Sequence, residues 1–522
     1  MAFYDNPQNV EVDPEADEAC VGKGMSWPDG RYEPGGRAVV HPDDAKTPDQ
    51  WVPRHPSLIR LTGKHPFNCE PPLPECFAEG FISECTARPA RRSSPPEGVR
   101  APRLTRRAAP APLHYVRNHG ACPKLDWATH RIEVKGNVRR KLSISMDELV
   151  KMPSYSFPCL LVCAGNRRKE QNMIKKSIGF NWGPCATATS WWTGVRLADI
   201  LKRAGVTKAG PGRRFVCFGG PQRELPQTYD GQQGGPGSYG TSIDIETALD
   251  PACDIMVAYK QNGELLHPDH GFPVRLLIPG YIGGRMIKWL CEIEVTDEES
   301  NNFYHFNDNR VLPVGVDVER ANREGWWFKP EYIINELNIN AAIAYPAHGE
   351  TISAAKPSYK LQGYAYSGGG RKVTRVEVSL DQGQSWQLAE VTVREKPRWG
   401  KGVSGAKAKW WCWCFWELAV PVKAIAGANE ICLRAWDEAQ NCMPDTPTWN
   451  VMGMMNNPWY RVRVHSAGHG ILRFEHPTQA GPDKEEGWMV QMAQKAPDGV
   501  LNWGWGGKGG PAAPPRPDLS PA

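Results

Sequence analysis

Residues 157–182 read Phe-Pro-Cys-Leu-Leu-Val-Cys-Ala-Gly-Asn-Arg-Arg-Lys-Glu-Gln-Asn-Met-Ile-Lys-Lys-Ser-Ile-Gly-Phe-Asn-Trp. The apolar run from Leu160 to Val162 predicts a short buried strand. This strand leads Cys163 into a turn, Ala-Gly-Asn, whose small residues let a backbone approach a ligand closely. Five cationic residues follow: Arg167, Arg168, Lys169, Lys175 and Lys176. A thiol beside so much positive charge is expected to have a lowered pKa, and the thiolate is the form that binds metals.

Cys163 therefore has two interpretations. The first is a thiolate at the mouth of a pocket that attracts anions. The alternative is a buried structural cysteine at the end of a strand, which is the commoner role of a single cysteine. Features elsewhere in the chain bear on this choice.

Composition limits the class of protein. At 522 residues the chain is long enough for about three domains, and its net charge of +5 is too small to indicate a nucleic-acid partner. Residues 86–141 hold fourteen Lys and Arg against three acids, which favours either an anionic ligand nearby or a solvated basic tail. No run of eighteen apolar residues occurs, so no membrane span is expected.

The cysteines indicate the compartment. There are fifteen, an odd number, in a long chain whose first residues do not resemble a signal peptide. Spacings such as Cys159-x3-Cys163 and Cys412-x-Cys414 match no zinc module. We therefore expect reduced thiols and a cytoplasmic location.

Patterning along the chain predicts four regions. Residues 1–108 are rich in Pro, Gly and Arg, and we expect a largely disordered N-terminal extension, with short ordered parts at most. Residues 109–340 mix strands and helices without a regular βα repeat, which indicates an α+β catalytic domain. Residues 341–490 contain several short alternating strands, which indicate an immunoglobulin-like β-sandwich. Residues 491–522 resemble a flexible hinge or tail.

Several local elements follow from the pattern. Residues 131–138 and 214–218 predict strands, as do residues 272–279 and 289–295. Ser145 and Glu148 have the spacing of a capping box, so a helix is expected to begin there. Residues 195–205 predict an amphipathic helix closed by Gly205. Residues 373–389 predict a hairpin, residues 410–416 a buried aromatic strand, and residues 431–436 a further strand.

Four further groups carry candidate functional residues. They are Val116-Arg-Asn-His119, Pro268-Asp-His-Gly-Phe-Pro-Val-Arg275, Gly283-Gly-Arg-Met-Ile-Lys288 and Trp449-Asn-Val-Met-Gly-Met-Met-Asn-Asn457. Each group by itself is more simply a structural or solvated segment. Together with Cys163 they supply one thiolate, two histidines and several Arg and Lys, but no carboxylate pair and no Ser-His-Asp set. This combination suits an anionic metal cofactor better than hydrolysis.

These motifs resemble the sulfite oxidase family of molybdenum enzymes and, within it, the eukaryotic assimilatory nitrate reductases. Cys-Ala-Gly-Asn-Arg-Arg, Arg-Asn-His, Asp-His-Gly-Phe-Pro-Val-Arg and Gly-Gly-Arg-Met-Ile-Lys-Trp carry the resemblance, with support from Gly179-Phe-Asn-Trp-Gly, Trp411-Cys-Trp-Cys-Phe-Trp and Phe474-Glu-His-Pro-Thr-Gln. It covers about residues 112–490. The resemblance implies a sulfite-oxidase-like molybdopterin domain followed by a sandwich domain that forms a homodimer.

The resemblance also implies roles for particular residues. Cys163 would be the one protein ligand of a molybdenum–molybdopterin cofactor. The pterin and its phosphate would be held by Tyr115, Val116, Arg117, Asn118, His119, His270, Arg275, Met286, Ile287 and Lys288. The substrate pocket would be lined by Arg117, Arg168 and Trp182, with Asn309 and Met452 as determinants of nitrate over sulfite, because relatives that oxidise sulfite carry a tyrosine and an arginine there.

The implied reaction is the two-electron transfer of an oxygen atom from nitrate, which leaves nitrite. Complete nitrate reductases continue into haem and flavin modules, whereas none of the His-Pro pairs here is followed by Gly-Gly as in the haem motif. We therefore expect haem and FAD to be absent from this chain, and electrons to come from a separate donor protein or from modules outside it. Two alternatives remain: a haem-free sulfite oxidase on the same scaffold, and a cofactor-binding scaffold without redox activity.

Overall fold

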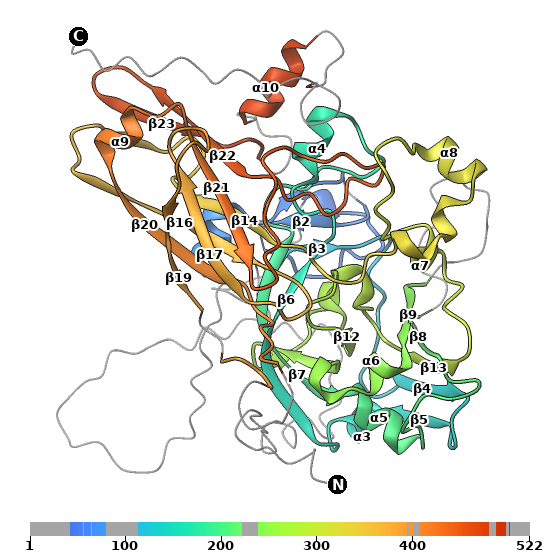
Figure 1. Cartoon of the computed structure of the whole chain (residues 1–522). Coiled ribbons are helices and arrows are strands. Elements are labelled where there is room, and N and C mark those ends of the chain that lie inside the picture. The colour runs from blue at the N-terminus through green and yellow to red at the C-terminus, as the bar shows by residue number, and fades with distance from the viewer. Residues whose placement is uncertain are drawn as a thin grey trace, which may run out of the picture.

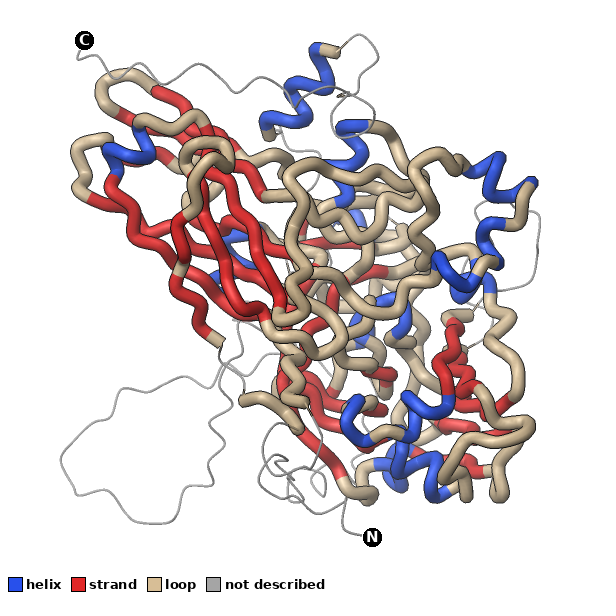
Figure 2. Tube along the Cα trace, in the orientation of Figure 1, coloured by secondary structure: helices blue, strands red, loops and turns tan. Residues whose placement is uncertain are grey.

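A computed structural model of the chain describes residues 42–55, 57–63, 65–79, 113–221, 238–393, 396–399, 407–479, 487–496 and 501. Two bodies of β-sheet lie side by side, with short helices around them (Figures 1 and 2). One body is formed mainly by residues between 113 and 339, and the other by the strands that follow.

The first body contains two five-stranded sheets. One has the order β11-β10-β7-β6, with β12 also paired to β10; its strands are β6 (Ser154–Val162), β7 (Thr187–Arg196), β10 (Met256–Gln261), β11 (Glu264–Leu265) and β12 (Arg275–Leu277). The other has the order β5-β4-β13-β8-β9; its strands are β4 (Arg131–Gly136), β5 (Leu142–Ser145), β8 (Phe215–Gly219), β9 (Gly240–Asp244) and β13 (Glu292–Thr296). β13 and β4 pair in parallel, and the other pairings in these two sheets are antiparallel.

Short helices connect these strands. They are α3 (Met146–Leu149), α4 (Arg168–Ile174), α5 (Leu197–Arg203), α6 (Ile245–Leu249), α7 (Phe303–Phe306) and α8 (Val318–Arg323), with 3-10 turns η2 (Pro251–Cys253), η3 (Pro268–His270), η4 (Gly283–Arg285), η5 (Trp326–Phe328) and η6 (Pro330–Tyr332). The predicted capping box is confirmed: Ser145 Oγ accepts from Glu148 N at 3.2 Å, and Glu148 Oε2 accepts from Ser145 N at 2.9 Å. The helix predicted over 195–205 begins at Leu197, because the two residues before it still belong to β7.

The second body is a sandwich of two antiparallel sheets. The four-stranded sheet has the order β14-β16-β20-β19: β14 (Asn340–Tyr345), β16 (Ser358–Tyr366), β19 (Glu390–Thr392) and β20 (Cys414–Pro421). The six-stranded sheet has the order β15-β23-β22-β21-β17-β18: β15 (Thr351–Ser353), β17 (Val373–Ser379), β18 (Gln387–Leu388), β21 (Glu430–Asp437), β22 (Tyr460–Ser466) and β23 (Ile471–Glu475). Helices α9 (Val422–Ala426) and α10 (Trp488–Lys495) belong to this half of the chain. The predicted sandwich and its hairpin β17–β18 are confirmed.

Strand β6 lies between the two bodies and is buried on both faces (Figure 1). Its residues Phe157, Cys159 and Leu161 pack into the core of the first body, whereas Leu160 and Val162 pack into the core of the sandwich. Alternate side chains of a strand point to opposite faces. The unbroken apolar run therefore serves two cores, and Cys163 emerges at the boundary between them.

The N-terminal region differs from the sequence expectation. Residues 42–79 contain η1 (Pro42–Asp44), β1 (Ile59–Arg60), β2 (Asn68–Glu70) and α2 (Leu73–Glu79), and β1 and β2 form a small sheet with β3 (Val116–Arg117). This segment is an ordered part of the predicted extension, because its polar residues are paired with partners far along the chain. Residues 1–41 and 80–112 lie outside the described residues.

The predicted tail also begins differently. Helix α10 extends across the expected boundary at residue 490, and its Trp488, Met489 and Ala493 pack with Ile174 of α4. Helix formation lets a short apolar stripe pack against a neighbouring helix. Residue 501 is described, and the other predicted tail residues, 497–500 and 502–522, lie outside the described residues.

A buried ion pair joins the two bodies. Asp254, at the end of η2, binds Arg398 through two contacts of 2.6 and 2.7 Å. The indole nitrogens of Trp399 and Trp411 donate to the same carboxylate at 3.0 and 2.9 Å. The Asp254 side chain is fully buried, so this contact strongly constrains how the bodies meet.

Substituting Asp254→Asn should lower the free energy of unfolding by about 3–5 kcal/mol, because a neutral amide replaces the carboxylate that binds the buried Arg398 through two contacts. Urea denaturation followed by tryptophan fluorescence measures this change. Glu417→Gln is the control: its pair with Lys360 is exposed and should contribute less than about 1 kcal/mol. Equal losses in the two variants would contradict the prediction.

Candidate active site

Cys163 follows directly after β6 and begins the turn that leads into α4. Its backbone N–H donates to the carbonyl of Ala186 at 2.9 Å, and its carbonyl accepts from Asn166 N at 2.9 Å. Arg167 ends the turn in a left-handed conformation, with φ of 64°. The Arg167 guanidinium binds Glu170 at 2.8 Å and reaches Asn340 of the sandwich at 2.8 Å. Both bodies therefore hold the Cys163 turn in place.

Cys163 opens into a partly open cavity that offers about 100 Å³ for the centres of water-sized molecules. Twelve of the residues singled out from the sequence line this cavity. They are Tyr115, Arg117, His119, Cys163, Arg168, His270, Arg275, Met286, Ile287, Lys288, Asn309 and Met452. The structure thus brings together segments that are more than 330 positions apart in the sequence.

Three predicted residues lie outside the lining. Trp182 is fully buried and meets the ring of Tyr115 edge-on at 6.0 Å, and its indole nitrogen has no hydrogen-bond partner among the described residues. Val116 packs into a small apolar cluster with Phe67 and Cys69. Asn118 is buried one layer back and binds Lys288 Nζ through its side-chain oxygen.

The structure adds residues that the sequence reasoning missed. Side chains of His114, Tyr239, Tyr304 and Asp308 also line the cavity. His114 and Asp308 are direct neighbours of Tyr115 and Asn309, so adjacency was an available signal. Asp269, which lies within the candidate group 268–275 but had been given no role, lines the cavity as well. Tyr239 and Tyr304 stand near no recognised motif, and the fold alone brings them to His119.

Two arginines flank the Cys163 turn. Arg117 donates to the carbonyl of Asn118 at 2.6 Å and contacts His119 Nε2 at 2.7 Å. Arg168 donates to the carbonyl of Gly453 at 2.9 Å. Its guanidinium is covered closely by Gly165 and Gly179, where a Cβ atom would come within 2.6 and 2.5 Å of it. Glycine at both positions therefore makes room for a buried arginine.

The cavity carries more positive than negative charge. Burial lowers the pKa of Lys288 to about 7, with Asp269 opposing the shift and Arg275 adding to it. Burial likewise lowers the pKa of Arg275 to about 10. Burial lowers the pKa of His270 well below its usual value, and the charges of neighbouring histidines and Arg275 lower it further. A bound anion would relieve these shifts, because an opposite charge favours the protonated forms.

The acids in the cavity are already engaged. Asp269 binds Arg54 at 2.9 Å, and Asp308 lies 3.4 Å from His119. In contrast, His270 Nε2, Arg275 Nε and His114 Nε2 are buried and have no hydrogen-bond partner among the described residues. Buried polar atoms are nearly always satisfied. Arg275 Nε–H can donate to an oxygen atom of an anionic ligand. Nδ1 of His114 and Nδ1 of His270 each lie against an oxygen acceptor, so their Nε2 atoms can donate to an anion only when the imidazoles are protonated.

The expected low pKa of Cys163 is not found. Burial raises the pKa of the Cys163 thiol, and Arg168 and Arg117 counteract the shift only in part. Lys169 donates to the carbonyl of Gln479 at 2.7 Å, Lys175 lies 4.0 Å from the ring of Trp449, and Lys176 is exposed. The helical path of α4 thus carries most of the sequence-adjacent cations away from the sulfur.

Asn309 and Met452 reach the cavity from different directions. Asn309 has φ of 56°, a conformation that asparagine tolerates well and a tyrosine adopts poorly. Met452 belongs to a sandwich loop whose Met455 N donates to the carbonyl of Ala164 at 2.7 Å. This contact brings the second body into the wall of the cavity beside the Cys163 turn.

Within the described ranges, no group of three or more His, Cys, Asp and Glu side chains is arranged to hold a metal ion. A metal at Cys163 would thus need further ligands from a cofactor. Among the described helices, none has the length and apolar content that a membrane crossing requires.

Comparison with known proteins agrees with this geometry. Residues 119–304 match the oxidoreductase molybdopterin binding domain, and residues 331–467 match the Mo-co oxidoreductase dimerisation domain. An NADH nitrate reductase of Volvox carteri is 52% identical over 462 residues, which are 87% of this chain and 49% of that protein. An NADH nitrate reductase of Arabidopsis thaliana is 50% identical over 468 residues, 88% of this chain and 46% of that protein. The chain spans about half the length of these curated relatives.

The sulfane dehydrogenase SoxCD of Paracoccus pantotrophus has a similar solved structure, with a TM-score of 0.51 and 21% identity, covering 67% of this chain and 79% of that chain. This likeness shows a shared fold. The two matched domains follow one another along the chain in the same order as the two bodies of β-sheet. Residues of both domains line the cavity. The chain therefore belongs to the molybdopterin-binding oxidoreductases with a Mo-co dimerisation domain, the family that includes the nitrate reductases it matches.

Proposed function

We propose that this chain is the catalytic part of a nitrate reductase, which reduces nitrate to nitrite in nitrate assimilation in the cytoplasm. The observation that carries the proposal is the cationic cavity beside Cys163, lined by Arg117 and Arg168. Identity of about half of all aligned residues to nitrate reductases supports the choice of substrate. The sandwich matches a dimerisation domain, and a homodimer through this domain is part of the proposal.

The residues present fit a molybdenum–molybdopterin cofactor. The partnerless Arg275 Nε–H suits its phosphate, and His270 suits it when protonated. The ammonium group of Lys288, whose three N–H groups are held by the protein, adds positive charge beside them, and the thiolate of Cys163 suits the metal. When bound, this cofactor would supply the two-electron, oxygen-atom-transfer chemistry of the reaction. The pKa of Cys163, raised by burial, means that metal binding would have to displace the thiol proton.

The protein's own contribution is to bind and orient the anion. Arg117 and Arg168 place fixed positive charge beside the sulfur, in a cavity where burial strengthens electrostatic interactions. Reduction of nitrate consumes two electrons and two protons and yields nitrite and water. The electrons would come from a donor protein or from haem and flavin modules outside this chain.

Metal analysis combined with turnover assays tests the proposal. The purified chain, produced in a host that makes the cofactor, should contain stoichiometric molybdenum and form nitrite from nitrate with reduced viologen as donor. Oxidation of sulfite without nitrate reduction would instead identify a sulfite oxidase. Absence of molybdenum would favour a scaffold without redox activity.

Replacing Arg117 tests its role in catalysis. Arg117→Ala should lower kcat/KM for nitrate by roughly a hundredfold per molybdenum, because developing oxygen charge loses a fixed cation in a buried site. Viologen-linked nitrite formation, normalised to metal content, measures the effect. Arg214→Ala removes an arginine that is 66% exposed and should leave the rate unchanged. Full nitrate turnover by Arg117→Ala with intact cofactor would refute the assignment.

Replacing Met452 tests the choice between nitrate and sulfite. Met452→Arg should raise the ratio of sulfite to nitrate kcat/KM by roughly tenfold, about 1.4 kcal/mol, because an added cation favours the more highly charged anion. Both substrates are assayed on the same preparation with artificial electron carriers. Met452→Leu keeps the size without the charge and should preserve the ratio. An unchanged ratio in Met452→Arg would remove Met452 from the specificity determinants.

A further inference from the structure

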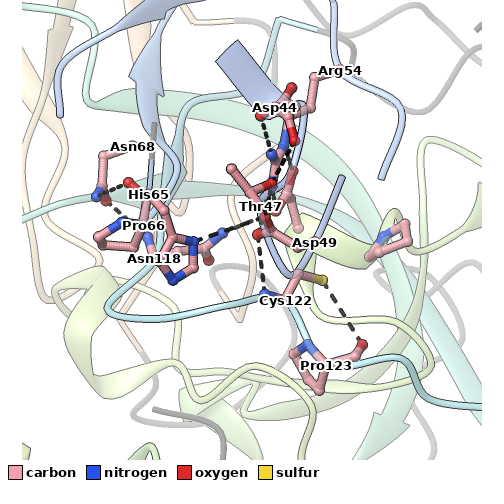
Figure 3. A network of polar contacts seen from close by, with 12 residues as sticks. Asp44, Thr47, Asp49, Arg54, His65, Pro66, Asn68, Asn118, Cys122 and Pro123 are labelled. Atoms are coloured by element: carbon pink, nitrogen blue, oxygen red, sulfur yellow. Dashed lines mark hydrogen bonds and ion pairs between the residues drawn. The ribbon is translucent and has the colours of Figure 1, made fainter. Parts of the chain in front are cut away.

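Arg54 lies at the centre of a buried ionic cluster in the N-terminal segment (Figure 3). Its guanidinium binds Asp44 at 2.7 Å, Asp49 at 2.9 Å and Asp269 at 2.9 Å. The Arg54 side chain is 3% exposed, and the three carboxylates are 2% exposed or less. Asp269 is 215 positions away and lines the cofactor cavity. The cluster thus joins a segment outside the matched domains to the candidate active site.

A chain of hydrogen bonds continues from Asp269 to Lys288. The Asp269 carboxylate, held by two Arg54 nitrogens, accepts from Asn118 Nδ2 at 2.9 Å. The side-chain oxygen of Asn118 then accepts from Lys288 Nζ. Lys288 Nζ also donates to the carbonyls of Asp269 at 2.9 Å and Arg117 at 3.0 Å. The position of the Lys288 ammonium group is therefore set by partners that Arg54 fixes.

The same segment also contacts Arg117. Strand β2 pairs with β3 so that Asn68 lies opposite Arg117. The side-chain oxygen of Asn68 accepts from Asn118 N at 2.9 Å and from Arg117 NH1 at 3.3 Å. Figure 3 shows Asn68 and Asn118 in one polar network with the Arg54 cluster. Two routes, which meet at Asn118, therefore connect this segment with cationic groups of the cavity.

We infer that Arg54 is a positioning residue of the active site, which acts through Asp269 and Asn118 to hold Lys288 for the anionic group of the cofactor. This inference rests on the proposed function, because it assumes that the cavity binds a molybdenum–molybdopterin cofactor. The described residues between 43 and 70 then help to position the residues of the site and are not a separate extension.

The electrostatics agree with this role. Burial by itself would raise the pKa of Asp269, but the charge and hydrogen bonds of Arg54 bring it down to about 2. Arg54 thus keeps Asp269 ionised inside the protein. Without Arg54, the buried carboxylate would take a proton or draw the Lys288 ammonium group toward itself. Either change would weaken the hold of Lys288 on an anion in the cavity.

A double-mutant cycle on the whole chain, purified with its cofactor, tests the inference. The rate of molybdenum loss during dialysis is measured by metal analysis for wild type, Arg54→Gln, Lys288→Gln and the double variant. Arg54→Gln should accelerate the loss roughly ten- to hundredfold, as is typical when an outer partner of a metal site is removed. In the Lys288→Gln background, Arg54→Gln should raise the rate of molybdenum loss by less than about threefold, because the two residues act on one interaction. Equal acceleration in both backgrounds would show a purely structural role and overturn the inference.

Matched variants separate positioning from loss of folding. Arg60→Gln breaks another buried ion pair to Asp44, which keeps its contact with Arg54, and among the described residues no ion pair joins Arg60 to Asp269. The rate of molybdenum loss should therefore change less than about twofold. Arg54→Lys keeps a charge beside Asp269, so its rate of molybdenum loss should lie nearer to that of wild type than the rate of Arg54→Gln.

A second variant applies if Arg54→Gln does not fold. Asn118→Leu interrupts the hydrogen-bond chain from Asp269 to Lys288 while leaving the Arg54 ion pairs, and its effect on the rate should show the same dependence on Lys288. Acceleration by Arg60→Gln equal to that by Arg54→Gln, or by Asn118→Leu independent of Lys288, would overturn the inference.

The readout distinguishes this inference from the proposed function. A chain that retains molybdenum but does not reduce nitrate would refute the nitrate activity, while the cycle would still decide the role of Arg54. A chain with active nitrate reduction and an additive cycle would refute the role of Arg54 alone. A wild-type chain without molybdenum would overturn both.

Discussion

The structure depends on a strand that is buried on both faces. β6 contributes alternate side chains to two separate cores, and its edge carries a further contact, since Leu160 N donates to the carbonyl of Trp411 at 2.8 Å. A strand held in this way has little freedom to shift register, because a slip of one residue would exchange its two faces. Cys163 therefore leaves the strand at a fixed place, on the boundary between the catalytic body and the sandwich.

The cavity beside Cys163 is built from segments that each core presents at this boundary. The first body supplies Arg117, His270 and Lys288, the sandwich loop supplies Met452, and the N-terminal segment supports the set through Arg54. The buried cations cost free energy because they are desolvated near one another. Asp254, Asp269 and Glu170 offset this cost by binding Arg398, Arg54 and Arg167. These arginines lie outside the anion pocket or at its edge, and the ion pairs hold the surrounding backbone in place. The positive charge that these carboxylates do not neutralise faces the cavity, where a bound anion would neutralise it.

Sequence patterns predicted the local elements well. The capping box at Ser145, the apolar run of β6 and the alternation of β17 depend on neighbouring residues alone, so they could be read in order along the chain. The motifs also identified most of the cavity lining. Trp182, which was predicted to line the pocket, lies one layer from it, with its ring edge-on against that of Tyr115. Tyr239 and Tyr304 were missed, because their role comes from contacts with His119 that no local pattern encodes.

The sequence by itself determined the family, the order of the two domains and the residues that carry charge and sulfur into the site. The tertiary structure decided which charges act there. The Cys163 thiol has a raised pKa in spite of the cations that follow it, because burial outweighs the charges that reach it and α4 directs most of the others elsewhere. The segment around Arg54, polar enough to be taken for a disordered extension, is ordered because its charges meet Asp269 across 215 positions. Desolvation and long-range pairing depend on three-dimensional surroundings, and for that reason they could not be inferred from the order of residues.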